Sequence, residues 1–113
     1  MIPVRDTAEL EAALGAPRAV LFKHSTRCGT SARALRQLES YEATAGAAPV
    51  YLLDVVAAPA LARSAAERLG IRHESPQAIV LSAGRPTWHA SHGRVTADAL
   101  VGATSAPEAG ARR

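Results

Sequence analysis

Hydrophobic and polar residues alternate along this chain in blocks that predict helices and strands in turn. Short, nearly continuous apolar runs predict buried strands, whereas apolar residues spaced three or four apart predict helices packed on one face. The predicted strands span residues 19–24, 49–55, 77–82 and 87–91. The predicted helices span residues 7–14, a stretch from the turn at residue 28 to about residue 45, residues 59–69, and a stretch from residue 96 to about residue 102.

The order of these elements is helix, strand, helix, strand, helix, strand, strand, helix. Short loops and right-handed crossovers make the first two strands parallel, and a turn at residues 83–86 makes the last two an antiparallel hairpin. This order predicts an α/β protein with a four-stranded mixed sheet flanked by helices, as in the thioredoxin-like fold. We expect one domain over residues 1–102 and a flexible C-terminal tail over residues 103–113, whose side chains are small, polar or charged.

Composition narrows the function classes. Of the 113 residues 48% are hydrophobic but only 4% are aromatic, so alanine and leucine must build the core. The formal net charge is +3, and no aromatic residues are interleaved with the basic ones, so we expect no nucleic-acid surface. No apolar window is long enough to cross a membrane, and the chain does not start like a secretory signal. With a single cysteine, these features predict a reducing, cytoplasmic location.

That cysteine, Cys28, lies where a predicted strand runs into a predicted helix. The unpaired amides and the positive end of the helix dipole favour the thiolate there. The flanking residues are polar, which favours a reactive thiol over a cysteine that only fills a gap in the core. Three residues on, where a dithiol redox protein has its second sulfur, the chain has Ser31. One such sulfur can exchange with a disulfide but cannot close one within the site, so the pattern predicts a monothiol.

Several neighbours are candidates for tuning this thiol. Arg27 brings a positive charge next to the sulfur, and Lys23 and His24 would add to it if they face the thiol. Ser31 lies one helical turn away on the same face, where its hydroxyl either hydrogen-bonds the sulfur or is merely that of a first-turn residue. Gly29 either leaves room for a small-molecule thiol or is only a permissive turn residue.

A second informative stretch precedes the third predicted strand. A cis bond between Ser75 and Pro76 would make a tight turn that exposes the backbone of the preceding residue, as expected of one wall of a substrate groove. His89 and His92 share one hairpin arm and its loop, and two such ligands do not make a metal site. We therefore expect no metal.

Together these stretches resemble the monothiol bacilliredoxins, type C, of the thioredoxin-like superfamily. The similarity covers about residues 10–101 and rests on the strings Phe22-Lys23-His24-Ser25-Thr26-Arg27-Cys28, Tyr51-Leu52-Leu53-Asp54-Val55, Arg72-His73-Glu74-Ser75-Pro76-Gln77-Ala78 and Trp88-His89-Ala90-Ser91-His92. It implies that Cys28 is the nucleophile and that Pro76 is a cis-proline beside it. One departure is Gly29, because the family usually has proline directly after the cysteine.

The activity that the resemblance implies is the reduction of mixed disulfides between proteins and bacillithiol, a cysteinyl-glucosaminyl-malate thiol. Cys28 would attack the mixed disulfide, release the reduced protein and carry the bacillithiol until an outside thiol regenerates it. The partners would be S-bacillithiolated proteins and a low-molecular-weight thiol, with bacillithiol as co-substrate and no bound cofactor. Neither nucleic acid nor membrane is expected as a partner.

Two alternatives belong to other function classes. The glycine after Cys28 also resembles the cysteine-glycine-phenylalanine-serine of monothiol glutaredoxins, in which two chains share an iron–sulfur cluster. Here Thr30 replaces the phenylalanine, and the other strings point away from that family. The remaining alternative is a binding module that keeps the thioredoxin fold and uses Cys28 only structurally.

Overall fold

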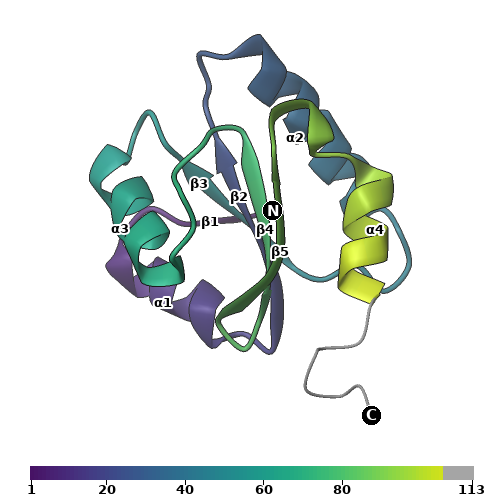
Figure 1. Ribbon diagram of the computed structural model, residues 1–113, viewed down its shortest axis with the longest axis horizontal. Helices are drawn as coiled ribbons and strands as arrows, with labels where there is room; N and C mark the ends of the chain where they lie inside the picture. Colours follow the sequence, from purple (N-terminus) through teal and green to yellow (C-terminus); the bar gives the residue numbers. More distant parts are fainter. Residues whose placement is uncertain (106–113) are drawn as a thin grey trace.

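A five-stranded mixed sheet runs through the middle of the computed structural model, which describes residues 1–105 (Figure 1). Its strands are β1 (Ile2–Pro3), β2 (Arg18–His24), β3 (Val50–Asp54), β4 (Gln77–Ser82) and β5 (Arg85–Ser91). They lie side by side in the order β1-β3-β2-β4-β5. Strands β1, β3 and β2 are parallel, whereas β4 pairs antiparallel with both β2 and β5. The α/β class and the thioredoxin-like fold are thereby confirmed.

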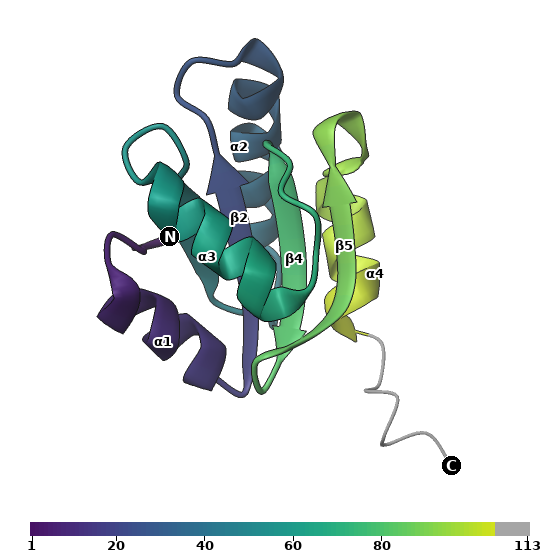
Figure 2. The ribbon, with the colours of Figure 1, turned by 60° about the vertical axis from the view of Figure 1, so that its left-hand side comes forward.

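Two layers of helices cover the sheet (Figures 1 and 2). The helices are α1 (Thr7–Gly15), α2 (Gly29–Glu42), α3 (Pro59–Leu69) and α4 (Ala97–Ser105), with a single 3-10 turn, η1 (His92–Arg94), before α4. Helices α1 and α3 lie on one face of the sheet, and α2 and α4 lie on the other. Among the described residues, no helix combines the length and the apolar character needed to cross a bilayer.

The sheet has one strand more than the four that were predicted. The extra strand, β1, has only two residues, which pair with Tyr51 and Leu52 of β3. Two residues are too few to show an alternating pattern, and a proline argues against a central strand. At the edge of the sheet the missing amide of Pro3 is tolerated, because an edge strand needs partners on one side only.

Side chains of the central strand β2 alternate between two cores, because helices cover both faces of the sheet. Val20 and Phe22 enter the core beneath α2 and α4, whereas Leu21 enters the core beneath α1 and α3. The same alternation sends Lys23 to the α1/α3 face and His24 to the α2/α4 face. Lys23 and His24 therefore cannot both face the thiol, as they would have to do for both to add to the positive charge beside it.

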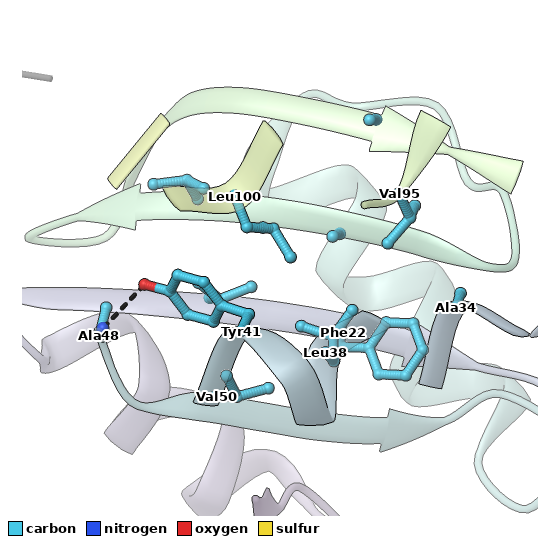
Figure 3. Close-up of a cluster of buried hydrophobic side chains, with 12 residues drawn as sticks. Phe22, Ala34, Leu38, Tyr41, Ala48, Val50, Val95 and Leu100 are labelled. Carbon is cyan, nitrogen blue, oxygen red and sulfur yellow. Dashed lines mark hydrogen bonds between the residues drawn. The ribbon is translucent and has the colours of Figure 1, made fainter. Parts of the chain in front are cut away.

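The last helix continues to Ser105 and so passes the predicted end at residue 102. The Tyr41 hydroxyl accepts a hydrogen bond from the Ala48 amide (2.8 Å, Figure 3) and donates one to Oγ1 of Thr104 (3.0 Å). Thr104 in turn donates to the Leu100 carbonyl at 2.8 Å, which ties the last turn of α4 to α2. Residues 103–105 thus belong to the domain, and the rest of the predicted tail, residues 106–113, lies outside the described residues.

The hairpin between β4 and β5 turns on Ala83 and Gly84, whose φ angles are +50° and +80°. A Cβ added to Gly84 would lie 2.7 Å from the Leu14 carbonyl oxygen. We expect Gly84→Ala to lower the free energy of unfolding by about 2 kcal/mol, because the new methyl group meets both a left-handed backbone and a fixed carbonyl. Urea unfolding measures this difference. Gly102→Ala, which adds a methyl group in open space on α4, is the control and should keep or raise the stability.

Candidate functional site

Cys28 occupies the position directly before the first turn of α2, at the end of the loop that leaves β2. Its amide donates to the Ser25 carbonyl at 3.3 Å, and its carbonyl accepts from the Ala32 amide at 3.1 Å, which begins the helix. The side chain is half-buried and carries a free thiol. The predicted placement of the sulfur at a strand-to-helix turn is confirmed.

The surroundings of Cys28 favour the thiolate. The pKa of Cys28 lies below its usual value, first because the Ser31 backbone amide points toward the sulfur, and further because of the Thr30 amide and hydroxyl. Partial burial opposes this shift. Within the described part of the chain, the sulfur of Cys28 does not accept a capping hydrogen bond from a backbone amide of the first turn of α2. The two amides therefore act as oriented dipoles, which is the effect expected at the amino end of a helix.

The Ser31 hydroxyl hydrogen-bonds His24 and Ser25, so a hydrogen bond to the sulfur, one of the two alternatives that the sequence left open, is not the one found among the described residues. The Ser31 side chain is fully buried, and its Oγ lies 2.7 Å from Nδ1 of His24. The same Oγ accepts the Ser25 backbone amide at 2.9 Å. The hydroxyl is thus engaged away from the sulfur, and it is the backbone amide of Ser31 that faces Cys28. Residue spacing alone cannot tell which of the two groups turns toward the thiol.

His24 is the functional candidate whose contacts the sequence did not predict. It is buried at the end of β2, pairs in register with Asp54 of β3, and stacks on Phe22 with ring centroids 5.5 Å apart. Burial lowers the pKa of His24, and the negative charge of Asp54 and a backbone interaction with Ser31 oppose that shift only in part. A neutral imidazole at neutral pH follows. The available signal in the sequence was a polar residue that ends an apolar strand four positions before the cysteine.

The other two predicted tuning residues lie at the surface. Arg27 is exposed, and its amide donates to the Ser25 hydroxyl at 3.4 Å. The groups that lower the pKa of Cys28 belong to Thr30 and Ser31, and Arg27 is not among them. Gly29 is exposed, and a Cβ added there would meet open space. Gly29 is not among the glycines with a positive φ, so its backbone does not require glycine.

Strand pairing brings the turn at Ser75 and Pro76 to the end of the sheet where Cys28 lies. The Ser75–Pro76 peptide bond is cis, as the resemblance implied. Gln77, the next residue, pairs with Lys23 of β2, so the turn lies at the same end of the sheet as the loop that leads to Cys28. The Ser75 hydroxyl is buried and has no hydrogen-bond partner among the described residues. The Pro76 carbonyl accepts the His92 amide at 2.9 Å, which holds the turn against η1.

A buried lysine of β2, whose side chain lies on the sheet face opposite to His24, hydrogen-bonds the residue that follows this turn. Lys23, the only lysine in the chain, is fully buried and donates from Nζ to Oε1 of Gln77 at 3.0 Å. Nε2 of Gln77 donates to the Arg72 carbonyl at 3.1 Å and to the Ser91 hydroxyl at 3.5 Å. Burial lowers the pKa of Lys23 to about 8, although the charge of Glu74 opposes the shift. Lys23 therefore supports the wall of the site rather than the thiol.

Within residues 1–105 no three histidine, cysteine, aspartate or glutamate side chains gather to hold a metal ion. His89 and His92 are exposed at the end of the hairpin. Chemically, the assembled site consists of one thiol at a helix start, a serine that cannot displace a bound thiol, and a cis-proline turn at the same end of the sheet.

Comparison with known proteins agrees with this geometry. The family model described as monothiol bacilliredoxin BrxC matches residues 3–100. A solved structure of a candidate oxidoreductase with a thioredoxin fold is 27% identical, with a TM-score of 0.82, and the match covers 90% of this chain and 91% of that one. These two matches support thiol redox chemistry at a general level.

More distant structures share the fold alone. A mutant thioredoxin from Halobacterium salinarum is 20% identical, with a TM-score of 0.73 over 95% of this chain and 93% of that one. Mitochondrial thioredoxin 3 from Saccharomyces cerevisiae is 13% identical, with a TM-score of 0.74 over 93% of each chain. Their likeness supports the thioredoxin-like arrangement of strands and helices.

Proposed function

The chain belongs to the monothiol bacilliredoxin family, and from this premise we propose that it reduces mixed disulfides between proteins and bacillithiol through Cys28. Thiol redox chemistry at this general level is supported by the family match and by the oxidoreductase neighbour. The observation that carries the proposal is the half-buried Cys28 thiol, whose pKa is lowered by the amides of the first turn of α2.

The first step is a thiol–disulfide exchange. The Cys28 thiolate attacks the bacillithiol sulfur of the mixed disulfide, a bond forms between these two sulfurs, and the original disulfide bond breaks. The protein sulfur leaves as a thiolate and takes a proton from water. The target protein is thereby reduced, and the electron pair has come from Cys28, which now carries bacillithiol as a disulfide.

The second step needs a thiol from outside the chain, because Cys28 is the only cysteine. A low-molecular-weight thiol, free bacillithiol in this proposal, attacks the bacillithiol sulfur on Cys28 and releases the Cys28 thiolate. The products are the regenerated protein and a bacillithiol disulfide. Ser31 cannot compete in this step, since a hydroxyl does not displace a thiol from a disulfide.

The same proposal defines the partners and the location. The substrates are S-bacillithiolated proteins, bacillithiol is the co-substrate, and no bound cofactor takes part. Neither nucleic acid nor a membrane is a partner, and the reaction belongs in a reducing cytoplasm, where free thiols persist.

The test is single-turnover reduction of one carrier protein loaded through one cysteine with bacillithiol or, as a matched substrate, with glutathione. We expect release of the carrier thiol, together with a mass increase on Cys28 equal to one bacillithiol. We also expect the bacillithiol substrate to react faster than the glutathione substrate. Equal rates would contradict the bacillithiol preference, and release of the carrier without any adduct on Cys28 would contradict the mechanism.

A further inference from the structure

We propose that His24 is a positioning residue for the Cys28 thiolate, because its imidazole accepts a hydrogen bond from the Ser31 hydroxyl and so fixes the first turn of α2. The two atoms, Nδ1 of His24 and Oγ of Ser31, are 2.7 Å apart. The inference rests on the proposed function in taking Cys28 as the reactive thiol. It adds a residue that acts on the sulfur through another residue.

The direction of this hydrogen bond follows from the partners of Ser31. The Ser25 backbone amide can only donate, and it donates to Oγ of Ser31 at 2.9 Å. The Ser31 side chain is fully buried, so its own proton needs an acceptor inside the protein. Nδ1 of His24 lies at hydrogen-bond distance and supplies it. The imidazole therefore carries its proton on Nε2 and is neutral.

Ser31 transmits this constraint to the sulfur through its two polar groups. Its hydroxyl is held by His24 and Ser25, and its backbone amide points toward Cys28 and is the first cause of the lowered thiol pKa. Both groups belong to one residue in the first turn of α2. Fixing the hydroxyl therefore fixes the direction of the amide before the thiolate forms, which is how preorganised dipoles stabilise charge.

His24 is itself held firmly enough to serve as the anchor. Its backbone pairs with Asp54 where the adjacent strands β2 and β3 end, and its ring stacks on Phe22, a residue of the core beneath α2 and α4. The negative charge of Asp54, its partner across the β2–β3 pair, acts on the imidazole. The sheet thus sets the position of the imidazole, and the imidazole sets the position of the helix start.

The experiment measures the pH dependence of Cys28 alkylation by iodoacetamide in the full chain, which needs no disulfide substrate. His24→Phe keeps an aromatic ring but removes the acceptor, and His24→Asn keeps an acceptor near the position of Nδ1. Ser31→Ala removes the donor and, with it, the acceptor of the Ser25 amide. His89→Phe, on an exposed histidine of β5, is the matched control. Circular dichroism and urea unfolding establish that each variant is folded.

We expect His24→Phe and Ser31→Ala each to slow alkylation at pH 7 by about three- to tenfold, which corresponds to a rise of about half to one unit in the Cys28 pKa. The double variant should be no slower than Ser31→Ala alone, because that variant has already lost the hydrogen bond to His24. His24→Asn and His89→Phe should stay close to the parent protein.

A folded His24→Phe or Ser31→Ala variant with the parental pKa would overturn the inference. So would an equal loss in His24→Asn and His24→Phe, because ring packing rather than the acceptor would then matter. If His24→Phe does not fold, Ser31→Ala and His24→Asn still decide the question. A failure of the proposed function would be detected in a different experiment, the comparison of bacillithiol and glutathione mixed disulfides. That experiment does not depend on the pKa differences between these variants.

Discussion

Cys28→Ser is expected to lower the rate of mixed-disulfide reduction by about a thousandfold or more, to the uncatalysed rate. A serine hydroxyl is almost never ionised near neutral pH, and no second thiol exists in the chain to replace the lost one. The measurement is release of the carrier thiol with a chromogenic reagent. An active Cys28→Ser protein would remove the basis of the proposed mechanism.

The matched control moves the thiol instead of deleting it. Ser40 is exposed on α2, far along the helix from its amino end. The double variant Cys28→Ser with Ser40→Cys therefore carries one accessible thiol without the amides of the first turn. We expect it to stay near the uncatalysed rate. Recovery of parental activity by this variant would show that any exposed thiol on the fold suffices.

The parent enzyme should also show a simple dependence on pH. The folded Cys28 has a lowered pKa, so the reactive thiolate is gained as pH rises through a value below that of an ordinary thiol. We expect the single-turnover rate to rise through this inflection and then to level off. An inflection at or above the pKa of a free thiol would contradict the role of the helix amides.

Burial of Lys23 should make the stability of the protein rise with pH. The pKa of this amine is about 8 in the folded chain, against an ordinary value of 10.5. Between these two values the unfolded chain binds more protons than the folded one, so the free energy of unfolding increases with pH across that window. The size of the rise is about 3 kcal/mol, and it is complete above pH 10.5.

Lys23→Met tests this expectation, because the variant cannot titrate at this site. Urea unfolding of both proteins at a series of pH values from 7 to about 11 should show the rise in the parent and its loss in the variant. Arg36→Met, on the exposed side of α2, is the control for removing a positive charge and should keep the parental pH dependence. Identical pH profiles for the parent and Lys23→Met would contradict a depressed amine pKa.

Much of the fold could be predicted because the sequence contains long, strongly patterned elements. The apolar runs that became β2, β3 and β4 and the glycine that ends α3 are local signals, and the structure has them where they were expected. The two-residue strand β1 and the last turn of α4 could not be predicted in this way. Both depend on distant partners, namely the edge of β3 and the Tyr41 hydroxyl.

In the candidate site, too, features set by local sequence could be predicted and features set by distant partners could not. The position of Cys28 before a helix could be predicted from local residue types and spacing, whereas the cis bond before Pro76 was what the family resemblance implied. The partner of the Ser31 hydroxyl could not be predicted, because the hydrogen bond to His24 depends on how the first turn of α2 is rotated against the sheet. The burial of Lys23 also escaped prediction, since a lysine after an apolar run normally marks the exposed end of a strand.

Because the only lysine is buried, chemical labelling of its amine can be used to monitor local unfolding of the protein. Reagents that acylate primary amines meet two targets in this sequence, the ε-amine of Lys23 and the α-amine of Met1. The α-amine is paired with Glu42 at 3.0 Å near the surface, whereas the ε-amine is buried and donates to Oε1 of Gln77 at 3.0 Å. Acylation at residue 23 therefore requires an opening that breaks the contact with Gln77 and exposes the amine to solvent, so its rate reports on such openings.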